Sequence, residues 1–201
     1  MNVNMGLDMI LRFSFVLLAS LLVGCFNEPE PAYKTVPAEN RVYLSDKGLK
    51  DFPQVNAKAD YLNLDRNQLE KADGVEKLTE LKWLRLNDNR LAALPDLKPL
   101  TKLRRIYLKN NRFTAVPEAL KDLPSLTDVD LSGNPVKEIP AWLAQKQGLK
   151  NLSFSRTQVT KLPDDLTAWK SLHSLQLGDL RLTAEEMARI RKALPAVAIV
   201  F

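Results

Sequence analysis

Two hydrophobic patterns alternate along the chain and recur at spacings of 20 to 23 residues. The first reads Leu-x-x-Leu-x-Leu-x-x-Asn-x-Leu and is clearest from Leu81 to Leu91, from Leu103 to Phe113 and from Leu126 to Val136. Its alternating apolar positions predict a short strand with one buried face. The second pattern is an apolar residue followed by proline, as at Leu94-Pro95, which suits the first turn of a short helix.

The asparagine of the first pattern sets the spacing of the repeats. Successive equivalents are 20, 22, 22, 23, 23 and 23 residues apart, at Lys47, Asn67, Asn89, Asn111, Asn134, Thr157 and Leu180. A side-chain amide at the exit of a strand can donate to and accept from backbone groups that the turn leaves unpaired. We therefore expect Asn67, Asn89, Asn111 and Asn134 to form a structural ladder and not a polar active site.

The first pattern and its spacing resemble the repeat of the leucine-rich-repeat family, the ribonuclease-inhibitor-like solenoids. The resemblance covers residues 41–182 and implies an α/β solenoid of about seven coils. It implies a parallel β-sheet on the concave face and short helices or 3₁₀ segments on the convex face. One coil cannot bury its apolar face alone, so neighbouring coils must bury it for each other.

Residues 183–201 are expected to cap the C-terminal end of the solenoid. Thr183-Ala-Glu-Glu186 has the pattern of a capping box and predicts a helix through about Leu194. Beyond Pro195, apolar residues alternate at Val197, Ile199 and Phe201. This alternation predicts one last strand over the final coil.

The first 25 residues have the pattern of a secretory signal peptide. An apolar run from Phe13 to Val23 follows Arg12 and ends at Gly24 and Cys25. Leu22-Val23-Gly24-Cys25 resembles the lipobox of bacterial lipoproteins, which implies lipidation of Cys25. The alternatives are an ordinary signal peptide with an unmodified cysteine, or a transmembrane helix, for which the run is short of the roughly 20 residues needed.

The residues after Cys25 bear on location. In lipoproteins an aspartate directly after the cysteine commonly signals retention in the inner membrane, and Phe26 stands there instead. By resemblance, the chain is an outer-membrane lipoprotein that faces the periplasm or the cell surface. Residues 26–40 contain three prolines and no apolar periodicity, and they read as an extended tether.

The repeat phase also predicts which strand residues are displayed together on the concave face. Aromatic and arginine residues gather in the first four strands, and these are the residue types that most often dominate binding energy. We therefore expect an exposed binding surface made of Tyr43, Tyr61, Trp83, Arg85, Arg105 and Tyr107. The alternative is that aromatics simply favour strands and that arginine stacks on them for local stability.

Composition narrows the function further. The formal net charge is +5, but the 29 basic and 24 acidic residues are interspersed, which argues against nucleic acid as a partner. One cysteine and one histidine, His173, exclude an internal disulfide and a structural zinc site. No nucleophile with a base is indicated, so we expect no enzyme activity, catalytic residue, metal or cofactor.

The hypothesis that follows is a bacterial leucine-rich-repeat lipoprotein, monomeric, that binds another protein of the cell envelope or surface through its concave face. The alternative is an envelope-structural role, or binding of glycan or lipopolysaccharide, with the aromatic rings stacking on sugars.

Overall fold

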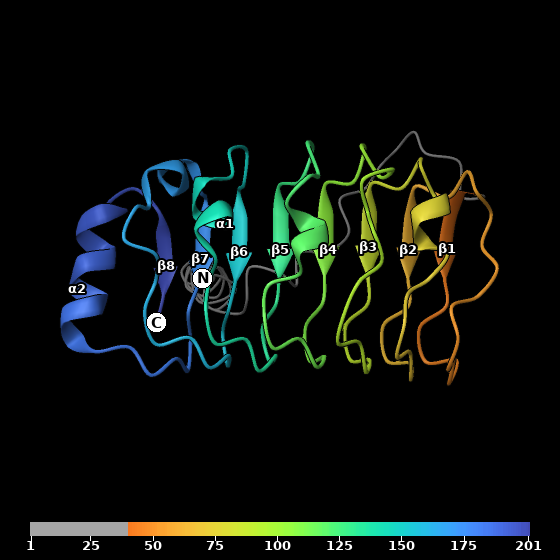
Figure 1. The fold of residues 1–201 in the computed structure, drawn as a ribbon, viewed down its shortest axis with the longest axis horizontal. Coiled ribbons are helices and arrows are strands. Elements are labelled where there is room, and N and C mark those ends of the chain that lie inside the picture. Colours follow the sequence, from red (N-terminus) through yellow and green to blue (C-terminus); the bar gives the residue numbers. More distant parts are fainter. Residues whose placement is uncertain (1–39) are drawn as a thin grey trace, which may run out of the picture. The chain divides into compact units, whose positions relative to one another are not determined.

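The computed structural model describes residues 40–201, which form a solenoid with one parallel sheet. The eight strands follow one another in sequence order across the sheet. Each has three residues: β1 (Arg41–Tyr43), β2 (Tyr61–Asn63), β3 (Trp83–Arg85), β4 (Arg105–Tyr107), β5 (Asp128–Asp130), β6 (Asn151–Ser153), β7 (Ser174–Gln176) and β8 (Ala198–Val200). The predicted leucine-rich-repeat solenoid, with its parallel sheet, is confirmed (Figure 1).

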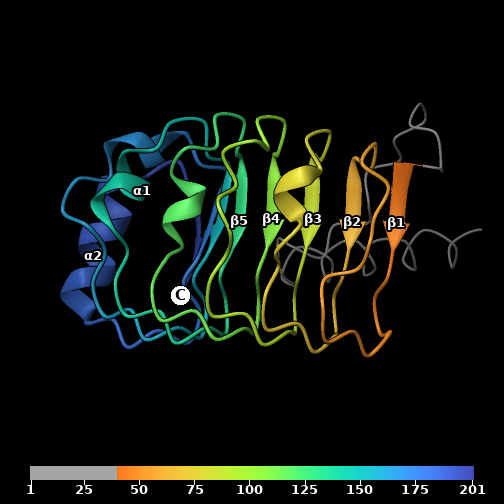
Figure 2. The ribbon, with the colours of Figure 1, turned by 45° about the vertical axis from the view of Figure 1, so that its right-hand side comes forward.

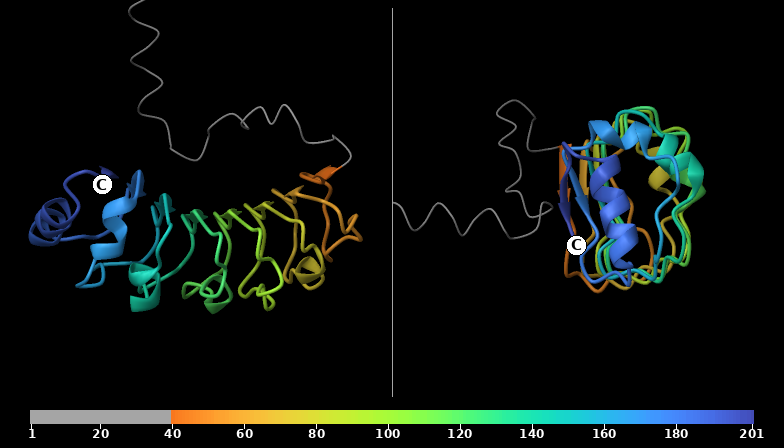
Figure 3. Two further views of the ribbon diagram at one scale, coloured as in Figure 1. Left: turned by 90° about the horizontal axis from the view of Figure 1, so that it is seen from above. Right: turned by 90° about the vertical axis from the view of Figure 1, so that its left-hand side faces the viewer.

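Short helical segments run along the side opposite the strands (Figures 1 and 2). They are the 3₁₀ helices η2 (Val75–Lys77), η3 (Glu118–Leu120) and η4 (Thr167–Ser171) and the helix α1 (Ala141–Gln145). Pro117 and Pro140 stand at the N-caps of η3 and α1, where a proline's missing N–H costs no helical hydrogen bond. Seen from above, the coils form an arc with the strands on its inner side (Figure 3).

The strands pair in the register that the repeat spacing predicts. Tyr61 pairs with Trp83, Trp83 pairs with Arg105, and Arg105 pairs with Asp128. The central residue of each strand points into the core, as Leu62 and Leu84 do. Because side chains alternate along a strand, the residues on either side of it line the concave face in two columns.

Stacked leucines fill the interior between the sheet and the convex segments. Leu62, Leu84 and Leu86 are completely buried, and so are the convex leucines Leu97 and Leu120. Trp169 also lies fully inside, where its indole N–H donates to the Leu143 carbonyl at 3.0 Å. Each coil thus buries the apolar face of its neighbour, as solenoid stability requires.

The asparagines at the strand exits bond to two coils at once. Asn89 donates to the carbonyls of Leu64 at 2.9 Å and Leu86 at 3.2 Å, one in the preceding coil and one in its own. Its side-chain oxygen accepts from the N–H of Leu69 at 3.0 Å. Asn67, Asn111 and Asn134 make the equivalent contacts. These contacts hold successive turns at one spacing.

The C-terminal end is closed by α2 (Ala184–Ala193) and β8. The Thr183 hydroxyl accepts from the N–H of Glu186 at 3.2 Å, which is the first half of the expected capping box. The second half is absent, because Glu186 instead accepts from the N–H of Leu162 at 2.8 Å and pairs with Arg189. Glu186 therefore joins the cap helix to the preceding coil.

The predicted signal peptide with Cys25, and the predicted tether of residues 26–40 except its last residue, lie outside the described residues. Within residues 40–201, no helix has the length and apolar character needed to cross a membrane.

Candidate functional site

Four aromatic rings form an unbroken row across the first four strands of the concave face. The ring centroids of Tyr43 and Tyr61 are 5.1 Å apart, and those of Tyr61 and Trp83 are 5.2 Å apart in an edge-to-face arrangement. Trp83 and Tyr107 follow at 5.9 Å. Such ring pairs add stability beyond the area they bury. Residues from four separate coils are thus in contact on one surface, outside the leucine core.

Two arginines lie over this row of rings, which we call the aromatic row. The guanidinium of Arg105 stands 4.8 Å from the centroid of the Trp83 ring, and that of Arg85 stands 5.8 Å from the Tyr107 ring. Both distances are in the range of cation–π attraction. All six predicted site residues therefore lie together.

The prediction that all six would be exposed is wrong for three of them. Tyr61, Trp83 and Tyr107 keep only 5%, 6% and 6% of their surface exposed. Side chains on adjacent strands stand about 4.8 Å apart, so neighbouring rings cover one another's faces. Tyr43 lies on β1, which has a strand neighbour on one side only among residues 40–201, and it is 50% exposed.

The arginines keep more of their surface than the rings below them. The side chains of Arg85 and Arg105 are 26% and 27% exposed. The accessible part of the predicted surface therefore consists of Tyr43 and the two arginines, with the remaining rings as a rigid support.

The indole N–H of Trp83 is a buried donor without an acceptor among the described residues. Leaving a buried donor unsatisfied costs about 1–3 kcal/mol, and native proteins retain few such groups. The leucine core does not need this side chain, since Trp83 lies on the other face of the sheet. The unpaired indole N–H therefore carries a local energetic cost at the centre of the aromatic row.

Arg85 and Arg105 differ in how they are held. Arg85 forms an ion pair with Asp65 at 2.7 Å, and its Nε also donates to this carboxylate at 2.8 Å. Burial raises the pKa of Asp65, and the guanidinium of Arg85 opposes that rise. Arg105 forms a longer ion pair with Asp128 at 3.7 Å, which is beyond hydrogen-bond distance. The sequence analysis did not include Asp65 in the site. Its position one coil before Arg85 could have suggested an ion pair between the two residues.

The last strands of the concave face carry small polar residues whose groups bond to one another. Asp128 accepts from Asn151 at 2.5 Å and from the Thr127 hydroxyl, and Ser174 donates to Asn151 at 3.0 Å. Asp130 accepts from the N–H of Ser132 at 2.8 Å and from its hydroxyl. Burial raises the pKa of Asp130, and these hydrogen bonds limit the rise. This part of the face satisfies its own polar groups.

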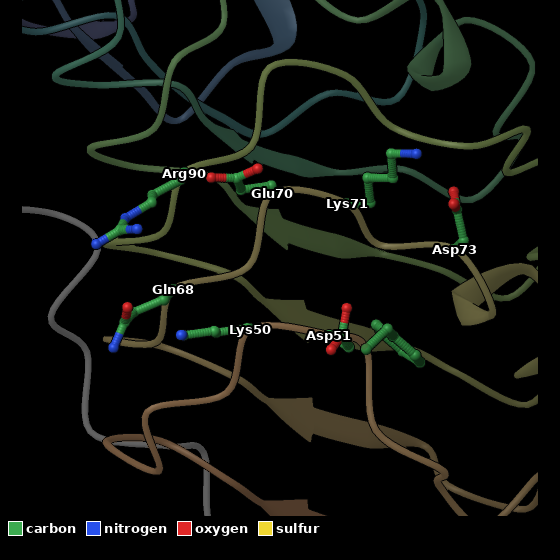
Figure 4. A pocket seen from close by; sticks show the side chains of 8 residues that line it. Lys50, Asp51, Gln68, Glu70, Lys71, Asp73 and Arg90 are labelled. Atoms are coloured by element: carbon green, nitrogen blue, oxygen red, sulfur yellow. The ribbon is translucent and has the colours of Figure 1, made fainter.

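A hollow of about 650 Å³ lies away from the sheet, on the first three coils. Figure 4 shows its lining side chains spread over successive coils instead of converging on one point. They are Lys50, Asp51, Phe52, Gln68, Glu70, Lys71, Asp73 and Arg90. Within residues 40–201, no cluster of three or more metal-ligating side chains occurs either. The aromatic row and its arginines remain the best-defined site.

Comparison with known proteins agrees with this fold. Residues 79–136 match a family model described as leucine rich repeat. A leucine-rich-repeat protein of Leptospira interrogans is similar, with 30% sequence identity and a TM-score of 0.69, over 76% of this chain and 40% of that one. An internalin of Listeria monocytogenes shares the fold at 21% identity and a TM-score of 0.55, over 72% of this chain and 50% of that one.

The chain thus spans half or less of the length of these two structures. No match was found among curated protein sequences. The fold class is that of the leucine-rich-repeat solenoids, and the two similar structures are of bacterial proteins. Solenoids of this kind commonly present their concave surface to a protein partner.

Proposed function

We propose that this protein is a lipid-anchored, extracytoplasmic binding protein that holds a protein partner against the first four strands of its concave face. It acts by binding alone, as a monomer, and we assign it no catalytic residue, cofactor or metal. The observation that carries the proposal is the accessible part of the predicted surface, which is Tyr43 on strand β1 with Arg85 and Arg105 lying over the buried rings.

The composition of this surface supports binding over a purely structural role. Tyrosine, tryptophan and arginine bring large contact area and hydrogen bonding to an interface at a modest entropy cost. Holding the rings against one another before binding removes part of the ordering cost that association otherwise carries. The unsatisfied indole N–H of Trp83 also fits a site kept for binding at some cost in stability.

Burial of the rings weighs against the glycan alternative. Sugar recognition by stacking needs an open ring face, and Tyr61, Trp83 and Tyr107 are covered by their neighbours. Only Tyr43 remains open among the rings of the row. Cosedimentation with purified cell wall or lipopolysaccharide separates the two functions, because a protein-specific binder stays in the supernatant.

The anchor and the location rest on the N-terminal sequence. Two or more acyl chains on Cys25 give stable membrane attachment, where one chain gives only marginal binding. The lipobox resemblance and Phe26 after the cysteine favour the outer membrane, with the domain facing the periplasm or the exterior. A Cys25→Ser variant is expected to leave the membrane fraction, whereas retention of this variant would argue against the anchor.

Photocrosslinking in intact cells tests the binding surface. We expect a photoreactive amino acid at Tyr43 to capture one protein in a discrete adduct, because Tyr43 is the open end of the aromatic row. The same amino acid at Lys137, which is exposed and outside the sheet, is the matched control and should give no such adduct. Equal adducts at both positions, or none at Tyr43, would contradict the proposal.

A further inference from the structure

The guanidinium of Arg105 is positioned by the Trp83 ring and by an ion pair with Asp128, but its N–H groups donate no hydrogen bond within the described residues. The guanidinium lies over the Trp83 ring at 4.8 Å, and the Arg105 side chain is 27% exposed. A guanidinium has five N–H donors in a planar fork. None of them makes a hydrogen bond to a residue within the described part of the chain, and the nearest carboxylate oxygen, of Asp128, is 3.7 Å away.

Asp128 forms an ion pair with Arg105 at 3.7 Å but accepts no hydrogen bond from it, and its oxygens accept from two neutral donors instead. Asn151 donates to Oδ1 at 2.5 Å, and the Thr127 hydroxyl donates to Oδ2. The other concave carboxylates are also satisfied, since Asp65 bonds to Arg85 and Asn87, and Asp130 bonds to Ser132. Asp65, Asp128 and Asp130 thus have hydrogen-bond partners, whereas the guanidinium of Arg105 has an ion pair but donates no hydrogen bond within the described residues.

Charge complementarity therefore favours a partner that supplies acceptors. A carboxylate fits the guanidinium fork with two parallel hydrogen bonds, which gives both strength and geometric specificity. Phosphate fits the fork as well. The strand β4, which carries Arg105, lies on the inner side of the arc of coils, so a ligand has to reach into the concave surface to meet it (Figure 3).

We infer that the protein partner presents an acidic segment, and that Arg105 on its Trp83 support receives a carboxylate of that segment. This inference rests on the proposed function and names the chemistry of the partner. Arg85 stands on the neighbouring strand but is already paired with Asp65, so it contributes less. We therefore expect Arg105 to be the residue through which the protein binds an acidic segment more tightly than a neutral one.

The test uses the purified full-length protein in detergent and three probes. The first is a fluorescent peptide of alternating glutamate and glycine, the second replaces each glutamate by glutamine, and the third is purified lipopolysaccharide. We expect the glutamate peptide to bind at least about tenfold more tightly than the glutamine peptide, a difference of about 1.4 kcal/mol. Arg105→Gln should remove most of that difference, and Arg105→Lys should restore only part of it because lysine lacks the fork.

Arg104→Gln is the matched control. Arg104 is the adjacent residue, it is exposed, and it lies outside the strand. Thermal unfolding of each variant checks that folding is intact. Equal losses in Arg104→Gln and Arg105→Gln, no preference for glutamate, or Arg105-dependent binding of lipopolysaccharide alone would each overturn the inference. A discrete protein adduct at Tyr43 in cells would still stand in these cases, so failure here is distinct from failure of the proposed function.

Discussion

The two halves of the concave face share one backbone register but use their side chains in opposite ways. Strands β1 to β4 carry the aromatic row and three arginines, Arg41, Arg85 and Arg105, whereas β5 to β7 carry aspartates, amides and hydroxyls. In the second half, Asp128, Asn151 and Ser174 bond to one another. In the first half, the indole N–H of Trp83 and the guanidinium of Arg105 donate no hydrogen bond within the described residues, although Arg105 forms an ion pair with Asp128 at 3.7 Å.

This difference shows that polarity alone does not mark a binding surface. The second half is the more polar one, but its groups satisfy one another and have little left to offer a partner. The first half retains unclaimed donors on a rigid support, which is the state that favours recognition. The following variants test this contrast, from the largest expected effect to the smallest.

The largest effect should come from the asparagine ladder, which both halves share. Asn89→Ala in the first half and Asn134→Ala in the second each remove bonds to two coils and leave buried backbone groups unpaired. We expect each to lower the free energy of unfolding by about 3–5 kcal/mol, measured by urea denaturation. A much larger loss in one half would show that the scaffold is not uniform.

Trp83→Ala should destabilise the first half and abolish binding together. Removing the ring opens a gap between Tyr61 and Tyr107 and takes away the support of Arg105, at a cost of about 3 kcal/mol in unfolding free energy. Trp83→Phe is the control, because it keeps a ring and removes the unsatisfied N–H. Its unfolding free energy should stay within about 1 kcal/mol of the wild type. A strongly destabilised Trp83→Phe would mean that the indole N–H has an acceptor.

Asp130 should make the second half sensitive to pH. Burial raises the pKa of Asp130 above 3.8 in the folded state, so the unfolded chain ionises first as the pH rises. Stability contributed by the protonated group is therefore full below pH 3.8 and is lost as the pH rises through the raised pKa. Unfolding measured at several pH values should show Asp130→Asn gaining stability relative to the wild type toward neutral pH. A constant difference would contradict the raised pKa.

Asp65 is the buried aspartate of the first half that corresponds to Asp130 in the second. Burial raises its pKa as well, but Asp65 holds Arg85 in an ion pair, so Asp65→Asn is expected to weaken partner binding. Asp130→Asn should leave binding unchanged.

The smallest effect is expected for Ser174→Ala. The substitution removes one hydrogen bond to Asn151 on a partly buried pair, worth about 1 kcal/mol or less in unfolding free energy. Partner binding should be unaffected, because Ser174 lies in the second half of the concave face, where the polar groups bond to one another. Reduced capture of the partner by a folded Ser174→Ala variant would extend the binding surface beyond β4.

The sequence was sufficient to predict the register because the asparagine of each repeat marks the same point of every coil, and alternation along the strand then assigns each side chain to a face. Once the asparagine positions were aligned, Trp83 had to stand beside Tyr61 and Arg105, and it does. The strand β8 likewise lies where alternation at Val197, Ile199 and Phe201 predicted it.

What the sequence could not predict was how far neighbouring side chains would cover one another. Exposure of Tyr61 and Tyr107 depends on ring packing across strands, which no periodicity encodes. The same holds for Glu186. Its carboxylate accepts from the Leu162 N–H and pairs with Arg189, instead of accepting from the Thr183 N–H, because of how the cap helix docks on the preceding coil. Side-chain partners across coils require coordinates.

The most direct test measures the affinity of the protein captured at Tyr43 for two matched double variants of the full-length chain. Arg85→Gln with Arg105→Gln alters the first half, and Asp130→Asn with Ser174→Ala alters the second. We predict at least about a tenfold loss of affinity for the first pair and less than about a twofold change for the second. Equal losses for both pairs, or a greater loss for the second, would contradict the assignment of binding to the aromatic row and its arginines.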